Sequence, residues 1–355
     1  MKSYSEFWSE ISPAYPVSKG KIRPPIVCTP QVIDGLCTEK ILERLADLLQ
    51  GILDMSGGRE GAVKRAVSAG EEVIVNHITE EYTGVVRFDC VVDECGGVHV
   101  LELNADYPDG LLLHDYTYQT ISGTPCGLHK ENLSALLYPI RNSAIHILHP
   151  KDAGFLDAYY AEYEHLRSLG HKVSIGSEVL SEDVQVIRRC TEVSKHIPEE
   201  KVENVRYINT YALRTLGYKQ ELVHIEHDMI PKTFDIKEVS STMLTEKDRW
   251  VLKPSSGCEG GGVVVGCEVS DTEWEDTLSN IPSGYVAQAY VQVPKRDVLI
   301  YEDGDILKKS LYYDWSPHFF VLNGQVVDRG HILMRFSASP IVNVHKGGAI
   351  GYHVL

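Results

Sequence analysis

The sequence predicts a multidomain protein of the α+β or α/β class, and three observations support this. The chain of 355 residues is longer than the size at which a single hydrophobic core stops growing. Its hydrophobic fraction of 43% and charged fraction of 24% are those of an ordinary soluble globular protein. Segments with the helical period alternate along the chain with apolar segments of strand length. We therefore expect helices and sheets in more than one domain.

The charge balance and the cysteines limit the partners and the compartment. A net charge of −16 argues against a nucleic-acid partner; it is compatible with a cationic small molecule, although solubility alone explains many acidic proteins. The N-terminus has no secretory signal pattern, and no apolar run is long enough to cross a bilayer. The eight cysteines are scattered without a C-x-x-C pair, as expected of reduced thiols. We expect a cytoplasmic protein with no nucleic-acid and no membrane partner.

The first 140 residues are expected to combine helices with one hairpin. Residues 38–55 repeat apolar side chains at spacings of three and four, which predicts an amphipathic helix, and a shorter helix is expected over 59–70. Residues 84–93 and 97–105 are strand candidates separated by the turn sequence ECGG. This spacing predicts an antiparallel β-hairpin.

A small Rossmann-like unit is expected over residues 141–200. Residues 143–150 are a buried strand candidate, 154–170 an amphipathic helix that ends at a glycine, and 171–177 a second strand. A strand–helix–strand order is typical of a parallel sheet. The segment contains no G-x-G-x-x-G sequence, so we assign it no dinucleotide.

The remaining unit is expected to span residues 201–355 and to pack back on the hairpin of 84–110. A helix is predicted over 202–217. Strands are predicted over 249–254, 262–269 and 284–293, and a hairpin around the Asn-Gly turn at 323–324.

The stretch VLKPSSGCEGGGVVVG, residues 251–266, places a lysine, two serines and four glycines between two apolar runs. Glycine permits sharp turns and lets backbone N–H groups approach a ligand closely. Such donors beside a lysine form an anion site, and the usual anion is phosphate. A hairpin whose glycines serve only the turn fits this segment equally well.

Four polar residues of the first hairpin are expected to converge. Arg87 and Asp89 are two residues apart, as are Glu102 and Asn104, so each pair shares one face of its strand. Two carboxylates, an amide oxygen and an arginine suit Mg²⁺ with a phosphate beside it, whereas the alternative is a polar outer face on surface strands. Because the four residues lie among apolar ones, and buried charge must be paired or metal-bound, we favour a binding site.

These motifs resemble those of a known family. The segment RFDCVVDECGGVHVLELNADYPDG, with its R-x-D and E-x-N-A-D-x-P patterns, resembles the metal-binding segment of glutathionylspermidine synthetase-like enzymes, which are circularly permuted ATP-grasp proteins. In ordinary ATP-grasp ligases the E-x-N motif follows the lysines and the glycine loop, whereas here it precedes them. The resemblance covers roughly residues 84–110 and 205–350. It implies a permuted ATP-grasp fold together with the small Rossmann-like unit, of preATP-grasp type.

The resemblance also implies roles for individual residues. Asp89, Glu102 and Asn104 are similar to the Mg²⁺ ligands of the family, and Arg87 to the arginine that steadies the γ-phosphoryl group during transfer. Arg335 is similar to the C-terminal arginine that contacts phosphate or acyl phosphate. The other residues expected to bind ATP form the two lysines, the mobile glycine flap and the adenine hinge: Lys232, Lys253, Ser256, Gly257, Gly260, Gly261, Gly262, Gln288, Ala289, Tyr290 and Val291. Asn343 is expected near Arg335. The hinge departs from many ATP-grasp enzymes, which carry an acidic residue where this chain has Ala289.

The reaction implied is the ATP-dependent joining of a carboxylate and an amine into an amide, through an acyl phosphate, with ATP and two Mg²⁺ ions as cofactors. Positioning and charge stabilisation carry such catalysis, because the protein forms no covalent intermediate. Two alternatives remain open: a nucleotide-binding regulatory protein without ligase activity, and a small-molecule kinase on the same fold. The sequence identifies neither the acid nor the amine, and it leaves the oligomeric state open.

Overall fold

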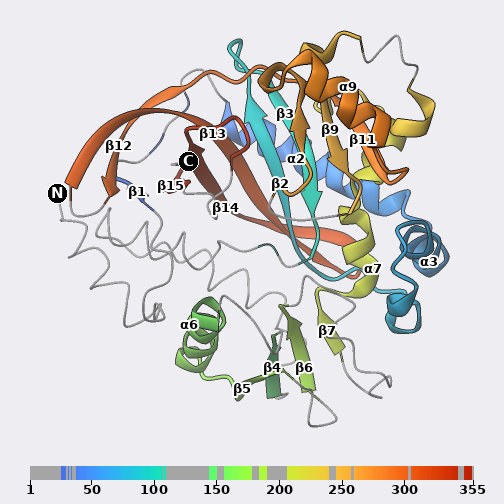
Figure 1. Ribbon diagram of the computed structural model, residues 1–355. Helices are drawn as coiled ribbons and strands as arrows, with labels where there is room; N and C mark the ends of the chain where they lie inside the picture. Colours follow the sequence, from blue (N-terminus) through green and yellow to red (C-terminus); the bar gives the residue numbers. More distant parts are fainter. Residues whose placement is uncertain are drawn as a thin grey trace.

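The computed structural model describes residues 25–28, 31, 33, 37–106, 108, 144–149, 156–177, 184–189, 206–239, 245–256, 260–302, 305–342 and 348–353. Within these residues the strands form three sheets (Figure 1). None of the described helices is long and apolar enough to cross a membrane.

The largest sheet has seven strands and carries most of the core. Its order is β12 (Arg296–Glu302), β1 (Ile26–Val27), β15 (Ala349–Tyr352), β14 (Gln325–Ser337), β13 (Asp305–Leu322), β2 (Gly84–Val92) and β3 (Val98–Asn104). The hairpin predicted at 84–105 is confirmed as β2 and β3, and the turn predicted at 323–324 joins β13 to β14.

Helices cover one face of this sheet. The helix predicted at 38–55 is confirmed as α2 (Thr38–Asp54), followed by α3 (Gly58–Ser68). The apolar stripe of α2, including Leu45 and Leu49, packs into one cluster with Phe88 of β2 and Trp315 of β13. The opposite face of β2 is therefore the one left for polar side chains.

The second sheet is antiparallel and contains the glycine-rich stretch. Its order is β10 (Val264–Val265), β9 (Trp250–Pro254), β11 (Tyr285–Ala289) and β8 (Thr233–Asp235). Helix α9 (Asp271–Asn280) begins at a capping box formed by Ser270 and Glu273, and its Trp274 packs against Leu252 of β9 and Ala287 of β11. Figure 1 shows α9 and this sheet beside the β2–β3 hairpin.

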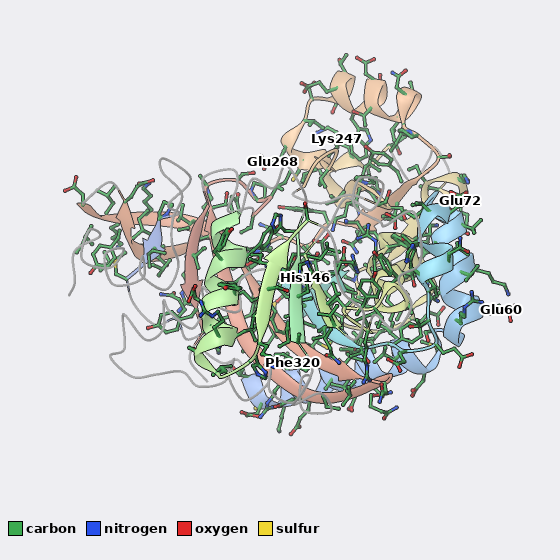
Figure 2. All side chains as sticks on the ribbon, turned by 90° about the horizontal axis from the view of Figure 1, so that it is seen from below. Glu60, Glu72, His146, Lys247, Glu268 and Phe320 are labelled. Carbon is green, nitrogen blue, oxygen red and sulfur yellow. The ribbon has the colours of Figure 1, made fainter. Side chains whose placement is uncertain are left out.

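The third sheet is parallel, as the strand–helix–strand pattern predicts. Its order is β5 (Val173–Gly176), β4 (Ala144–Leu148), β6 (Val184–Arg188) and β7 (Arg206–Ile208), with α6 (Leu156–Ser168) between β4 and β5 in the chain. Ile145 and Ile147 of β4 pack with Phe320 of β13, so this sheet adjoins the large one. Figure 2 shows Phe320 beside the strands that carry His146.

The helix predicted over 202–217 is wrong for residues 206–210 and confirmed for 211–214. Residues 206–208 form β7, because Tyr207 and Ile208 pair with β6 in the parallel sheet. The next residue, Asn209, has a left-handed φ of 67°, which ends the strand, and only then does the short helix α7 (Tyr211–Arg214) begin. The 3-10 helices among the described residues are η1 (Glu72–His77), η4 (Thr215–Gly217), η5 (Lys219–His224), η6 (Ile236–Glu238), η7 (Lys247–Arg249) and η8 (Gly266–Glu268).

A β-bulge interrupts the β2–β3 hairpin. Near the turn Cys90 pairs with Val100, but the next residue of β2, Asp89, pairs with Glu102, which leaves Leu101 as an extra residue. Because strand side chains alternate, an extra residue exchanges the two faces of β3 from that point on. Val100 therefore lies on the core face, and two residues later Glu102 lies on the opposite one.

Candidate functional site

The bulge brings the four predicted hairpin residues to one sheet face. Arg87 pairs directly with Asn104, and Asp89 pairs with Glu102. Directly opposed residues of an antiparallel pair project to the same side, so the two carboxylates, the amide and the guanidinium are neighbours. They lie on the face opposite the α2 core; Phe88 and Leu103 point into that core instead.

Asp89 lies at the centre of a buried ion cluster. Its Oδ1 accepts a hydrogen bond of 2.6 Å from Arg87 Nε, and its Oδ2 accepts one of 2.7 Å from Arg335 NH2. Arg335 Nε also donates to Oδ2 of Asp314, at 2.6 Å. Burial opposes ionisation of Asp89, but the charges of Arg335 and Arg87 outweigh it and hold the pKa of this carboxyl well below its usual value.

Asp314 is a member of this cluster that sequence reasoning missed. It lies on β13 directly opposite Arg335 of β14, and it is buried. Burial, together with the charge of Asp89, raises the pKa of Asp314 even though Arg335 is in contact with it. Arg335, predicted as a phosphate ligand, thus bridges two carboxylates, and its own pKa is raised by those two charges against the effect of burial.

Glu102 and Asn104 form the more open part of the face. Asn104 Nδ2 donates to Glu102 Oε1 at 3.3 Å, and Glu102 Oε2 lies 3.1 Å from Lys219 Nζ. Lys219 was not predicted as a site residue. It begins η5, and its backbone N–H donates to the carbonyl of Ser255 at 3.0 Å, which holds it beside the end of β9.

Lys253 faces this hairpin from the second sheet. Its Nζ donates to Gln288 Oε1 at 2.6 Å and to the backbone carbonyl of Leu101, the bulge residue, at 3.4 Å. Gln288 is fixed in turn by donating to Thr233 Oγ1 at 3.0 Å. Burial lowers the pKa of Lys253 to about 8, with a further lowering by Lys219 that the carboxylate of Glu102 opposes.

Lys232 directly precedes β8 in the structure. Its backbone carbonyl accepts a bond of 2.8 Å from the N–H of Ala289, so it extends the β8 ladder, but its side chain is exposed. The following residue, Thr233, projects toward Gln288, and adjacent residues of a strand project to opposite faces. Among the described residues, Lys219 pairs with the hairpin carboxylate Glu102, and Lys253 contacts the hairpin at the Leu101 carbonyl. A phosphate-binding role for Lys232 stays a prediction.

Residues 260–262 of the glycine stretch form a turn shortly before β10. Leu252 of β9 pairs with Val264 of β10, and Gly260 and Gly262 have φ values of 67° and 72°, which non-glycine residues rarely adopt. Ser256 and Gly261 are exposed. Gly257 lies outside the described residues, and so does Asn343.

The predicted adenine hinge spans the end of β11, with Gln288 and Ala289, and the two residues that follow it. The N–H groups of Ala289 and Tyr290 donate to the carbonyls of Lys232 and Arg249, at 2.8 and 2.7 Å. In the part of the chain that the structure describes, Val291 is the predicted hinge residue whose N–H has no such partner. Of the three amides, that of Val291 is therefore best placed to meet a ligand.

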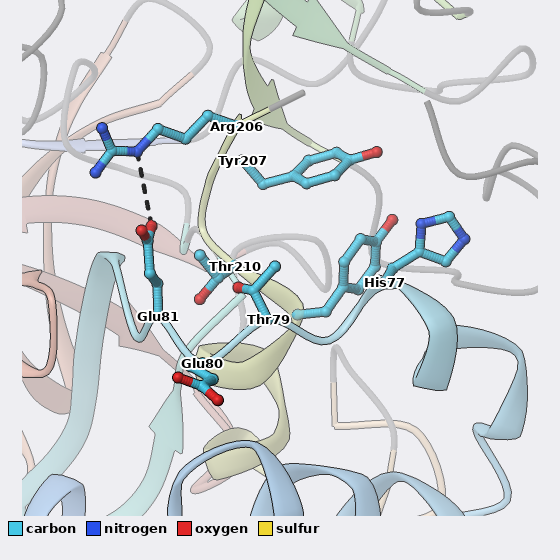
Figure 3. Close-up of a pocket in the computed structure, with 8 residues that line it drawn as sticks. His77, Thr79, Glu80, Glu81, Arg206, Tyr207 and Thr210 are labelled. Carbon is cyan, nitrogen blue, oxygen red and sulfur yellow. Dashed lines mark ion pairs between the residues drawn. The ribbon is translucent and has the colours of Figure 1, made fainter. Parts of the chain in front are cut away.

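A separate cavity of about 450 Å³ lies beside α7 (Figure 3). Its lining contains none of the predicted site residues: His77, Thr79, Glu80, Glu81, Arg206, Tyr207, Thr210 and Tyr211. Arg206 Nε and Glu81 Oε2, both on its rim, are 3.6 Å apart.

Comparison with known proteins identifies the fold. No protein-family model matches the chain, and no curated protein matches it. Among solved structures, it is similar to a glutathione synthetase-like effector from Globodera pallida in its apo form, with 12% sequence identity, a TM-score of 0.61, and coverage of 95% of this chain and 92% of that one. The chain has a glutathione synthetase-like ATP-grasp fold. At this sequence identity the similarity establishes the fold and nothing about activity or ligands.

An ATP-grasp fold implies ATP and Mg²⁺ in general, and the donor set of this chain fits them. Among the described residues, no three His, Cys, Asp or Glu side chains are grouped to hold a metal ion. The hairpin offers two carboxylates and an amide, which are hard oxygen donors, and Mg²⁺ is commonly bound by one or two carboxylates with phosphate oxygens and water. To act as a Mg²⁺ ligand, Asp89 would exchange one of its arginine contacts for the metal ion.

Proposed function

We propose that this protein is an ATP-dependent carboxylate–amine ligase that forms an amide through an acyl phosphate and releases ADP and phosphate. One observation carries the proposal: the face of Arg87, Asp89, Glu102 and Asn104 lies against Lys219 of η5 and Lys253 of the second sheet. Oxygen donors for a cation on one side and cations for phosphate on the other are what a metal–nucleotide complex requires.

Each group has a part in this proposal. Glu102, Asn104 and Asp89 would hold Mg²⁺, which offsets phosphate charge and orients the triphosphate. Lys253 and Lys219 would bind phosphate oxygens, in place of the Lys232 that the sequence suggested. Arg87 and Arg335 would contact the transferred phosphoryl group, and the amide of Val291 would meet adenine. The glycine turn would close over the phosphates and exclude water.

The order of these parts along the chain supports a circularly permuted ATP-grasp arrangement. The carboxylate hairpin at 84–104 precedes the lysine and glycine strands at 250–265, although the two lie side by side through the Lys253–Leu101 contact. The parallel sheet of β4 to β7 lies between them in sequence and would serve as the preATP-grasp-type unit.

A nucleotide-binding regulator without ligase activity is a second candidate, and one specific observation favours it. Both carboxylate oxygens of Asp89 accept hydrogen bonds from arginines, so a cation would have to compete with an arginine for this carboxylate. The similar protein from Globodera pallida is itself described as an effector. The same fold could also serve a small-molecule kinase.

Turnover against pools of acids and amines separates these functions. The purified protein is incubated with ATP, Mg²⁺ and the pools, and ADP, phosphate and new amides are measured by mass spectrometry. A ligase releases phosphate only when both an acid and an amine are present. Amine-independent formation of a phosphorylated product indicates a kinase, and Mg²⁺–ATP binding without turnover indicates a regulator. Absence of any Mg²⁺–ATP binding would contradict all three.

A further inference from the structure

Asn209 makes three side-chain hydrogen bonds to the ends of the hairpin strands. Its Oδ1 accepts from the N–H of Val85 at 3.0 Å, and its Nδ2 donates to the carbonyl of Val85 and to that of Ala105, both at 3.2 Å. The side chain thus completes the hydrogen bonding of Val85 as a strand neighbour would, and at the same time holds the residue that follows β3. Asn209 is fully buried.

The backbone around this contact is shaped for it. Asn209 has a φ of 67°, and the only other non-glycine residue with positive φ in the described part of the chain is Asn323, in the exposed β13–β14 turn. A buried residue in this region persists when its surroundings fix it. Gly84 leaves the necessary space, because a Cβ there would lie 2.5 Å from Asn209 Oδ1.

These contacts lie next to the candidate metal face. Val85 is two residues before Arg87, and Ala105 directly follows Asn104, so Asn209 joins β2 and β3 at the open end of the hairpin, where no turn holds them. The bulge at Leu101 lies on the other side of the Asp89–Glu102 pair. Asn209 also extends the link to the parallel sheet, since its carbonyl accepts from Arg188 at 3.2 Å.

We propose that Asn209 is a positioning residue for the metal face: it keeps Arg87 and Asp89 in register with Asn104 and Glu102. The role rests on the proposed function insofar as that face binds Mg²⁺. Removing a group that orients a metal ligand by a hydrogen bond commonly changes metal affinity or activity by about 10–100-fold, and Asn209 would orient the ligands through the strands that carry them.

The test uses Asn209→Gly, which accepts the left-handed backbone but removes all three bonds, and Asn209→Asp, which keeps the acceptor for Val85 and removes both donors. Asn323→Gly is the matched control, because it makes the same change at the other left-handed asparagine. The Mg²⁺ concentration at which ATP binding is half-saturated should rise about 10–100-fold in Asn209→Gly and stay unchanged in the control. ATP affinity without Mg²⁺ should change little in either variant, which a general loss of folding would not produce.

Hydrogen exchange of the nucleotide-free protein gives a readout that does not depend on the proposed function. Amides of residues 84–90 and 102–106 should exchange on the order of tenfold faster in Asn209→Gly than in wild type, because the bonds that close the strand ends are lost. Equal exchange in the two proteins overturns the inference. If Asn209→Gly does not fold, the exchange rates of the same amides are compared between Asn209→Asp and wild type, and equal rates again overturn the inference. A wild-type protein that does not bind Mg²⁺–ATP refutes the proposed function, while the exchange result still decides the role of Asn209.

Discussion

The two walls of the candidate site differ in how their charges are balanced. On the hairpin wall Asp89 is bonded to two arginines, so its charge is already neutralised. On the opposite wall the bonds of Lys253 go to neutral groups, the amide oxygen of Gln288 and the carbonyl of Leu101, and its pKa is lowered to about 8. The hairpin wall, formed by Arg87, Asp89, Glu102 and Asn104, therefore has its buried charge paired without a ligand. The lysine wall, which carries Lys253, is the side whose charge an incoming anion would stabilise most.

The largest effect is expected from breaking the hairpin wall. Asp89→Asn removes the charge that Arg87 and Arg335 share and leaves two buried cations with fewer anions. Loss of one partner of a buried pair costs about 3–5 kcal/mol. Urea unfolding should show a loss of this size in the free energy of unfolding, together with loss of any Mg²⁺-dependent turnover. Glu102→Gln is the control, because Glu102 is 27% exposed and should lose much less stability. An Asp89→Asn protein as stable as wild type would contradict the cluster described here.

The lysine wall is tested by comparing two lysines. Lys253→Ala should weaken ATP binding about 10–150-fold, the equivalent of a charge-assisted contact of about 1.5–3 kcal/mol. Lys232→Ala should change the affinity much less, because the side chain of Lys232 is exposed whereas that of Lys253 is buried. Calorimetric titration with a non-hydrolysable ATP analogue measures both. Equal losses in the two variants would restore Lys232 to the site.

The pKa of Lys253 gives a pH dependence of defined sign. In the free protein its ammonium loses its proton near pH 8, below its ordinary value of 10.5. A bound phosphate favours the charged form and raises the pKa, so binding near pH 8.5 should take up protons, and affinity should fall as pH rises above 8. Titrations in two buffers of different ionisation enthalpy measure the uptake. Lys253→Met should abolish it, and uptake that persists in this variant would assign the proton to another group.

For the free protein the same shift has the opposite consequence for stability. Between pH 8 and 10.5 the folded state binds fewer protons at Lys253 than the unfolded state does. Stability from this residue therefore increases with pH across that window. Denaturant unfolding of wild type and Lys253→Met at two pH values separates this contribution from that of other groups.

The smallest expected effect concerns the glycine turn. Gly262→Ala places a Cβ 2.7 Å from the Tyr285 hydroxyl in a residue with a φ of 72°, and left-handed backbone costs an L-residue about 1–2 kcal/mol. Gly284→Ala is the control, since nothing lies within 4 Å of its added Cβ. Thermal unfolding should show a lower Tm for Gly262→Ala alone. Similar Tm values would mean that the turn adapts without strain.

Sequence reasoning reached the strands of the site because alternation is a local property. Arg87 with Asp89, and Glu102 with Asn104, could be placed on shared faces from their spacing. Lys219 could not, because it begins a 3-10 helix with no periodic pattern, and its partner Glu102 is remote in sequence. Motif order favours Lys232 instead, and it carries no information on which lysine contacts Glu102.

The position of Asp314 opposite Arg335 could not be predicted, because the pairing of β13 with β14 is irregular. Counting outward from the Asn-Gly turn, where Leu322 pairs with Gln325, would bring Tyr312 opposite Arg335. Two register shifts, between Pro317 and Phe319 and between Phe320 and Val321, place Asp314 there instead. Bulges of this kind depend on packing across the sheet, so the pattern of β13 alone could not reveal them.

The extra residue at Leu101 makes this site sensitive to chain length as well as to residue type. Deletion of Leu101 would make Val100 and Glu102 consecutive, so Glu102 would stay opposite Asp89 and the polar face would be kept. An insertion of one residue between Leu101 and Glu102 would preserve every carboxylate and the turn. With the bulge kept, it would nevertheless turn Glu102 and Asn104 toward the α2 core and bring Leu103 to the face of Asp89. Single side chains can be exchanged here one at a time, but the gain of one codon at this point would invert the face that β3 presents.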